Sequence, residues 1–151
     1  MNSDPAVMRY FPARLTREES DAAVDRIEEM LARRGFTLYA AEFRDTADFI
    51  GFIGLWVPSF MDVVEIGWRL APAWWNRGLA TEGARAVLRH AFAYLGLDEV
   101  VAFTVPANLP SRRVMEKIGM THDPSRDFDH PKIAAGHPLR RHLLYRIGRE
   151  A

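Results

Sequence analysis

The segment WWNRGLATEG, residues 74–83, joins a strand-like run to a long amphipathic run and combines residue types that suit an anion site. At the start of a helix, backbone N–H groups without an intrahelical partner lie at the positive end of the helix dipole and attract negative charge. Gly78 and Ala80 present no bulky side chain, so an anion can approach the backbone closely. Each N–H bonded to a charged oxygen contributes about 1.5–3 kcal/mol, and several together can hold a diphosphate. The stretch NRGLATEG, residues 76–83, therefore predicts an anion site at this turn.

The residues of this turn do not by themselves choose a ligand. The chain has no G-x-x-x-x-G-K-[ST], and no G-x-G-x-x-G opens a helix, which excludes two common phosphate loops. A lone glycine before a helix is usually a tight turn and nothing more. Two interpretations of Gly78, an anion site and a plain turn, therefore stay open at this point.

Glu65 is a second residue with catalytic potential, because it stands in the otherwise apolar run VVEIGW. A carboxyl group embedded in an apolar strand tends towards a raised pKa and can act as a general base. The alternative is that Glu65 alternates outward and faces solvent. The histidines have no spacing that suits a metal on one element, so we expect no metal site and interpret them as loop and surface residues: His122, His130, His137 and His142.

The helices and strands that position these residues are predicted from the spacing of hydrophobic residues and from the residues that begin and end helices. A first helix begins at the capping box of Thr16 and Glu19 and ends at Gly35. Three strands of an antiparallel meander are expected to follow, at 36–42, 48–57 and 63–70. A helix at 81–95 then leads to a buried strand at 100–105, parallel to the third strand. Another helix at 110–118 and a long loop precede a last strand at 143–147. The predicted fold is a single α/β domain, residues 1–151, with a mixed, mostly antiparallel sheet flanked by helices.

The composition limits the classes of partner. With 151 residues, 48% of them hydrophobic, the chain is long enough for one well-packed core. Twenty basic and twenty acidic side chains cancel, which argues against nucleic acid or an anionic membrane as a partner. The absence of cysteine excludes disulfides, thiolate catalysis and cysteine-ligated zinc. Apolar stretches stay well below the roughly 18 residues of a membrane helix, so we expect a soluble, cytoplasmic protein.

Two sequence motifs, in a fixed order along the chain, indicate a class of function. WNRGLATE resembles the acetyl-CoA pyrophosphate loop of the GNAT superfamily of N-acetyltransferases, and NLPSRRVMEKIGM, residues 108–120, resembles its N-x-x-[SA]-x-x-[VL]-x-E-K-x-G-[FM] helix. The resemblance extends from about Met8 onward. Through EIGWRLAPAWWNRGLATEG it is closest to the branch that acetylates N-terminal amines of ribosomal proteins. It implies a GNAT-like fold, acetyl-CoA as co-substrate, no metal, and a primary amine as acceptor, which in that branch is a protein N-terminal amine.

The resemblance also implies where the co-substrate would bind. In the family, the strands before and after the second helix splay apart, and the pantetheine arm lies between them with strand-like hydrogen bonds. By carry-over, the backbone of Trp68, Arg69 and Leu70 would hold the pantetheine, and residues 76–81 would hold the pyrophosphate. Asn108 would lie near the thioester, and Met115 on the third helix would contact the co-substrate. Asn108 is also a candidate helix N-cap, and the two roles are compatible.

The implied reaction is direct attack of a neutral amine on the thioester, which requires positioning, removal of a proton and stabilisation of the departing thiolate. An N-terminal amine with a pKa of about 7.7–8.0 costs only about 1–1.4 kcal/mol to deprotonate near neutral pH, so a mild base such as Glu65 suffices. Where many family members carry a tyrosine as general acid, this chain has Met115. The resemblance then implies Ser111 as the acid, unless its hydroxyl is satisfied locally. His130 could border the acceptor pocket.

Several alternatives stay open. The acceptor can be a small-molecule amine, the chain can be a non-catalytic acyl-CoA-binding module, or it can be a structural domain whose glycine turn binds nothing. Family members usually begin with a strand and a helix before the segment that resembles NSDPAVMRYFP, and these are missing here. If that edge strand is truly lacking, the strand at 36–42 has an open edge that favours pairing with another chain, as in a homodimer.

Overall fold

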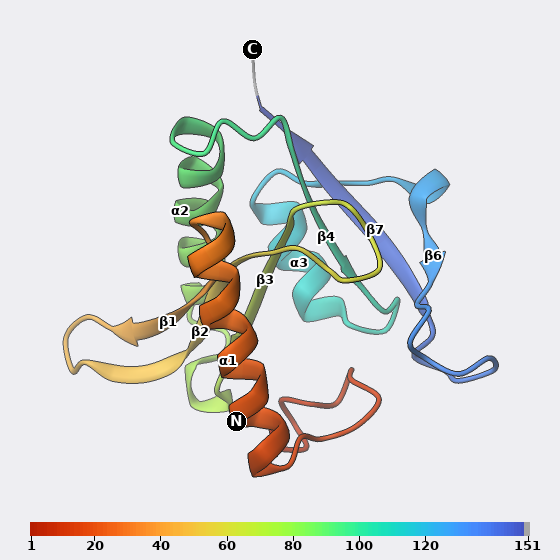
Figure 1. The fold of residues 1–151 in the computed structure, drawn as a ribbon, viewed down its shortest axis with the longest axis horizontal. Helices are drawn as coiled ribbons and strands as arrows, with labels where there is room; N and C mark the ends of the chain where they lie inside the picture. The colour runs from red at the N-terminus through yellow and green to blue at the C-terminus, as the bar shows by residue number, and fades with distance from the viewer. Residues whose placement is uncertain (150–151) are drawn as a thin grey trace.

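The computed structural model describes residues 1–149, and Figure 1 shows a central sheet with helices packed around it. The elements within these residues are α1 (Arg17–Arg34), β1 (Leu38–Phe43), β2 (Asp48–Trp56), β3 (Glu65–Leu70), α2 (Leu79–Ala93), β4 (Glu99–Thr104), α3 (Leu109–Lys117), β5 (Thr121–His122), β6 (Phe128–Asp129) and β7 (Arg141–Gly148), with short 3₁₀ turns at Pro72–Trp74 and Pro124–Arg126.

The sheet is mixed and mostly antiparallel. Its strands lie in the order β1-β2-β3-β4-β7-β5, and β6 pairs with β7. β1, β2 and β3 form the predicted antiparallel meander, β4 runs parallel to β3, and β7 runs antiparallel to β4. The predicted α/β fold class is therefore confirmed. β1 forms one end of the strand order and is an edge strand.

The helix ends show how local sequence sets the elements. The Thr16 side chain accepts a hydrogen bond from the Glu19 N–H, the Glu19 carboxylate accepts one from the Thr16 N–H, and Gly35 ends α1 with a φ of 73°. Both predicted ends of α1 are confirmed. α2 begins at Leu79, before the predicted start at residue 81, because Gly78 with a φ of 79° serves as its N-cap.

The segment expected to be one long loop before the last strand contains two short strands, β5 and β6. Both pair with β7, which begins at Arg141 instead of residue 143 and so offers a longer edge. A strand of two residues carries no hydrophobic period of its own, so only the presence of its partner strand reveals it.

The two faces of β3 meet different parts of the molecule. Ile66 and Leu70 are buried, and with Trp68 they pack in clusters that include residues of α2. Side chains alternate along a strand, so the opposite face carries Glu65, Gly67 and Arg69.

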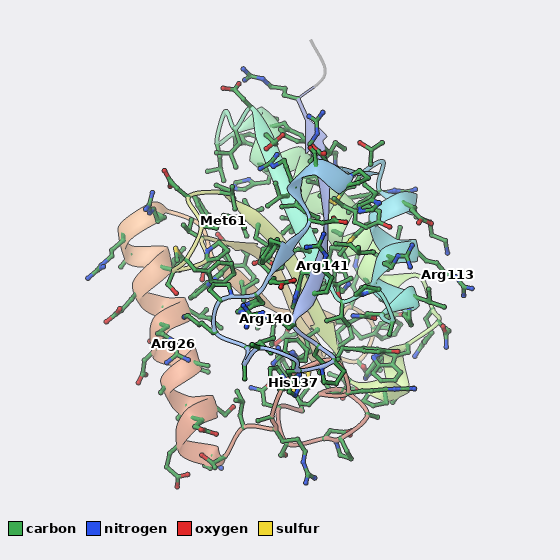
Figure 2. The ribbon with its side chains drawn as sticks, turned by 90° about the vertical axis from the view of Figure 1, so that its right-hand side faces the viewer. Arg26, Met61, Arg113, His137, Arg140 and Arg141 are labelled. Atoms are coloured by element: carbon green, nitrogen blue, oxygen red, sulfur yellow. The ribbon has the colours of Figure 1, made fainter. Side chains whose placement is uncertain are left out.

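The opposite face of the sheet is the side of α1 and the N-terminal segment. Arg69 contacts Asn2 and Phe11 of that segment. Figure 2 shows α1, labelled at Arg26, on one side of the sheet and α3, labelled at Arg113, on the other. The region between β3 and β4 therefore has two different sides, one towards α2 and α3 and one towards the N-terminal segment.

Candidate functional site

The turn before α2 presents a run of unpaired backbone N–H groups. Asn76 and Gly78 both adopt positive φ, 58° and 79°. The backbone bond that opens α2 runs from the Glu82 N–H to the Gly78 carbonyl at 3.0 Å. The N–H groups of residues 76–81 donate to no acceptor within residues 1–149. Six consecutive N–H groups without a partner among residues 1–149, next to a helix N-terminus, suit the binding of an anion.

Aromatic side chains hold this turn against the sheet. The Trp75 Nε1–H donates to the Leu70 carbonyl at 2.7 Å, and the Trp74 ring lies 4.8 Å from that of Phe43, centroid to centroid. The Arg77 guanidinium lies over both rings, 4.6 Å from Trp74 and 5.0 Å from Phe43. Because its side chain stacks there, Arg77 can serve an anion at the turn through its backbone N–H.

A hollow of about 380 Å³ adjoins the turn between α2 and α3. Its lining contains three cations and one carboxylate, and one of the cations, Arg85, donates to the Lys117 carbonyl at 2.8 Å. An excess of positive charge beside the free N–H groups suits a ligand with more than one phosphate. The lining residues are Gly78, Thr81, Glu82, Arg85, Arg89 and Lys117.

β3 and β4 are joined at one end only. The register pairs Glu65 with Val101, and the Val101 N–H donates to the Val64 carbonyl at 2.9 Å. Beyond that pair, the part of β3 described here has no register partner on β4. The two parallel strands therefore diverge towards their carboxyl ends, next to the turn before α2.

The backbone of β3 directs hydrogen-bonding groups into this gap. The Ala71 N–H donates to the Ile50 carbonyl on β2, so by alternation the backbone groups of Trp68 and Leu70 point away from β2 and towards β4. Those of Arg69 point back to β2. Trp68 and Leu70 are thus placed to make strand-like bonds to an extended ligand, although Trp75 already occupies the Leu70 carbonyl.

Glu65 stands where β3 and β4 are still joined. It lies opposite Trp56 on one side and Val101 on the other, and its residue is only partly exposed. Burial raises the pKa of its carboxyl from 4.5 to about 8. This value is close to neutral pH, as a general base requires.

The raised pKa of Glu65 predicts how stability depends on pH. The unfolded chain loses this proton near 4.5 and the folded chain near 8, so the stabilisation is fully present below 4.5 and is lost as pH rises to about 8. The loss is at most about 1.4 kcal/mol per pH unit. Urea unfolding of the wild type and of Glu65→Gln across this range should show a steeper decline in the wild type. Parallel curves would contradict the raised pKa.

Asn108 is the N-cap of α3. Its side-chain oxygen accepts from the Ser111 N–H at 3.4 Å, and its side-chain nitrogen donates to the Thr104 hydroxyl at 2.9 Å. Thr104 ends β4, so this bond ties the start of α3 to the strand that borders the gap. The Ser111 hydroxyl itself has no hydrogen bond among residues 1–149 and is only partly exposed.

Met115 lies in the core, where 2% of its surface is exposed and its side chain packs with residues of the sheet and α2. A contact between Met115 and a ligand in the gap stays a prediction. On the same helix, the Arg112 Nε–H donates to the Tyr145 hydroxyl at 3.2 Å. Sequence reasoning missed this buried tyrosine of β7, because the two residues stand far apart in the chain.

Two histidines belong to an aromatic cluster on the Arg69 side of the sheet. The interpretation of His142 as a loop or surface residue is wrong: it is 9% exposed, because β7 begins early enough to include it and alternation turns it inward. Its ring lies 5.1 Å from that of His130, and burial lowers the pKa of both imidazoles. The other rings of the cluster are Phe60, Phe103 and Phe128.

The tautomers of these two histidines follow from backbone contacts. The His142 Nδ1–H donates to the Arg140 carbonyl at 3.1 Å, which leaves Nε2 as an acceptor. The His130 Nδ1 accepts from the Lys132 N–H at 3.2 Å, so the proton of the neutral ring is on Nε2. In the neutral form, which burial favours for both rings, each ring brings one donor and one acceptor to the cluster.

No helix in residues 1–149 is both long and apolar enough to cross a membrane.

Comparison with known proteins agrees with this geometry. Residues 1–121 match the family model for the acetyltransferase (GNAT) domain. The chain is 34% identical over 122 residues to the uncharacterized N-acetyltransferase YnaD of Bacillus subtilis, which covers 80% of this chain and 69% of that protein. It is 43% identical over 82 residues, 47% of this chain and 35% of the relative, to the FsC-acetyl coenzyme A-N(2)-transacetylase of Aspergillus fumigatus.

Solved structures share the fold of this chain. The GNAT-family acetyltransferase from Bacillus anthracis superposes with a TM-score of 0.77 at 29% identity, covering 97% of this chain and 84% of that one. An acetyltransferase from Agrobacterium tumefaciens superposes with a TM-score of 0.79 at 24% identity, covering 97% and 80%. Since the family match spans most of the sequence and the relative from Bacillus subtilis is similar over most of its own length, the chain belongs to the GNAT family of acetyltransferases.

Proposed function

We propose that this protein is a single-domain, acetyl-CoA-dependent N-acetyltransferase that transfers the acetyl group to a primary amine by direct attack on the thioester. The observation that carries the proposal is the run of six N–H groups at residues 76–81, which have no partner within residues 1–149 and stand beside the gap between β3 and β4. A diphosphate at these groups places the rest of an extended co-substrate along the gap.

Each part of the site has a role in this proposal. The turn binds the pyrophosphate, Trp68 and Leu70 bind the pantetheine arm through their backbone, and Asn108 fixes the start of α3 beside the thioester. Glu65 accepts the amine proton, directly or through water, because its pKa of about 8 matches an α-amine of about 7.7–8.0. Ser111, whose hydroxyl has no partner among the described residues, protonates the departing thiolate.

Two acceptor classes fit the proposed reaction. The likeness of EIGWRLAPAWWNRGLATEG to the ribosomal-protein branch favours a protein N-terminal amine. The Arg69 guanidinium, whose Nε is buried and which forms no ion pair within residues 1–149, favours a small molecule that carries a negative charge. We take the small molecule as the better supported class, because the guanidinium belongs to this chain's own structure.

A non-catalytic acyl-CoA-binding module is the second candidate function. Met115 stands where many family members carry an acidic tyrosine, and a thioether cannot donate a proton. This candidate shares the co-substrate site with the first and differs only in turnover.

Two measurements in sequence test the proposal. Calorimetry with CoA and with acetyl-CoA should give saturable binding to one site. Release of free thiol should then be followed with acetyl-CoA and a panel of amines that includes amino acids, a peptide N-terminus and spermidine. Thiol release that depends on an amine supports the enzyme, binding without release supports the module, and absence of binding leaves the glycine turn purely structural.

The hollow beside the turn gives a testable contribution to affinity. Arg89→Ala removes one of its three cations, so CoA binding should weaken about threefold to tenfold, and less at high salt. Arg26→Ala, at an exposed arginine of α1 on the other side of the sheet, is the matched control and should leave affinity unchanged. If calorimetry gave the two variants equal affinities for CoA, the hollow would not be part of the CoA site.

A homodimer through β1 is also part of the proposal. β1 is an edge strand, and Tyr39 on β1 and Phe49 on β2 are 41% and 58% exposed. An edge strand with exposed aromatic neighbours supports pairing with a second copy.

A further inference from the structure

The face of β3 turned away from α2 carries a row of three residues whose middle member has no side chain. Glu65 and Arg69 stand at its ends and Gly67 in the middle. A Cβ on Gly67 would make an ordinary van der Waals contact with the Leu38 side chain at 3.7 Å and would meet no other atom within 4 Å, so the middle of the row has room for at least a methyl-sized group. With about 3.3 Å of rise per residue, the Cα atoms at the two ends are about 13 Å apart. A small molecule with two functional groups can lie over Gly67 with one group towards each end.

Arg69 is a cation that forms no ion pair with a carboxylate of residues 1–149. Its Nη1 donates to the Asn2 side-chain oxygen at 2.8 Å, and its guanidinium lies 4.2 Å from the ring centre of Phe11 and 5.1 Å from that of Phe52. Its Nε is buried and has no hydrogen-bond partner within residues 1–149, and none of its nitrogens forms an ion pair with a carboxylate there. Burial lowers its pKa to about 10, which still leaves it charged at neutral pH.

This arrangement of Arg69 favours the binding of an anionic group from a ligand. A cation removed from water is unfavourable unless it is paired and hydrogen-bonded, and aromatic rings with one amide compensate only in part. Arginine binds carboxylates through two parallel N–H groups, and of the five N–H groups of Arg69 only one, on Nη1, has a hydrogen-bond partner within residues 1–149. A ligand carboxylate would supply the missing partner.

The part of β4 across the gap from Gly67 carries an uncharged ring. Phe103 and Gly67 both stand two residues beyond the pair of Glu65 and Val101, so they lie on the same face of the sheet where the two strands diverge. The ring centre of Phe103 lies 5.2 Å from that of Phe128 and 5.9 Å from that of His142, and burial lowers the pKa of the His142 imidazole, which favours its neutral form. Further along this face, the Glu99 carboxylate forms ion pairs with the Nη1 atoms of Arg126, at 2.7 Å, and Arg146, at 3.4 Å. The rings of Phe103, Phe128 and His142 offer no carboxylate to a second amine, and the Asp62 carboxylate lines a hollow with Glu99 and Val101 at the Glu65 end of the row.

We infer that the acceptor is a small α-amino acid with an uncharged side chain, whose carboxylate binds Arg69 and whose amine lies above Gly67 towards Glu65. The inference rests on the proposed acetyl transfer. The amine nitrogen forms a bond to the thioester carbon, its proton passes to Glu65, the C–S bond breaks, and the thiolate takes up a proton. The products are an N-acetyl amino acid and CoA. A protein N-terminus has a peptide group in place of the carboxylate and would leave Arg69 unpaired.

Matched acceptors test the carboxylate directly. Thiol release is measured with phenylalanine and with phenylalaninamide, for the wild type and for Arg69→Met. The preference for the acid over the amide should fall at least about tenfold in Arg69→Met, mainly through KM for the acid, while CoA affinity stays unchanged. Comparing the two proteins cancels the different amine pKa values of the two acceptors. Arg69→Lys should retain part of the preference, because it keeps the charge and loses the paired donors.

The outcomes separate this inference from the proposed function. An acid-to-amide preference that is the same in wild type and Arg69→Met overturns the inference, as does transfer confined to a peptide N-terminus or to spermidine, while acetyl transfer itself stands. Release of thiol with none of the amines overturns both.

Gly67→Val provides a second variant in case Arg69→Met does not fold. Valine suits a strand, and its Cβ would make an ordinary contact with Leu38 while filling the space above the row. KM for the amino acid should rise at least about tenfold with CoA affinity unchanged. An unchanged KM would contradict an acceptor above Gly67.

Discussion

Replacing Gly78 with valine weakens CoA binding by more than about tenfold, which corresponds to about 1.4 kcal/mol or more. Gly78 has a φ of 79°, a conformation that a β-branched residue adopts only with strain. Relief of that strain turns the N–H groups of the following residues away from a common point. A Cβ at Gly78 meets nothing within 4 Å in the protein, so the effect arises from the backbone and from the space a ligand would occupy. Calorimetry with CoA measures it.

Gly96→Val is the matched control for this prediction. Gly96 also has a positive φ, 65°, with nothing within 4 Å of a Cβ, and it lies just beyond the opposite end of α2. Both variants carry a similar cost in stability, whereas only Gly78→Val should lose CoA. If Gly78→Val bound CoA as well as Gly96→Val does, the turn would have no part in co-substrate binding.

Glu65→Gln should lower kcat by about a hundredfold or more at neutral pH, with CoA affinity unchanged, because general bases commonly contribute about 10²–10⁴ in rate. The change keeps the size of the side chain and removes the proton acceptor. In the wild type, kcat should rise with pH as the carboxyl ionises near 8, and the variant should lose that ionisation from its profile. Steady-state thiol release across this pH range measures both effects.

Glu42→Gln serves as the control for Glu65→Gln. Glu42 is an exposed carboxylate on β1, outside the site, and its substitution should leave kcat unchanged. A Glu65→Gln variant with wild-type kcat and an unaltered pH profile would remove Glu65 from the mechanism. In that case positioning and solvent would have to account for the proton transfer.

Local signals explain which parts of the fold were predictable. The capping box of Thr16 and Glu19 and the stop at Gly35 set α1 within a few residues of sequence, and both appear in the structure. The strands of the meander are long enough to show their composition, and the turn at Gly78 combines a positive φ with a helix start. Features that depend on neighbours in sequence were therefore accessible without coordinates.

Features that depend on residues far apart in the sequence could not be predicted. Whether Glu65 faced solvent or was buried depended on what packs on β3, and the contact of Arg69 with Asn2 spans 67 positions. His142 was misassigned because its face depends on where β7 begins. The hollow beside the turn joins Arg85 of α2 to Lys117 of α3, and no local spacing relates those two residues.

The central claim is that the N–H groups of residues 76–81 converge on the diphosphate of CoA, and a titration followed by amide NMR of nitrogen-labelled protein tests it most directly. The account predicts that the resonances of these six N–H groups shift strongly as CoA is added and stop shifting at one equivalent, because they change from unpaired donors to donors bound to charged oxygens. Unchanged resonances at residues 76–81 under an excess of CoA, whether or not others move, would contradict the account.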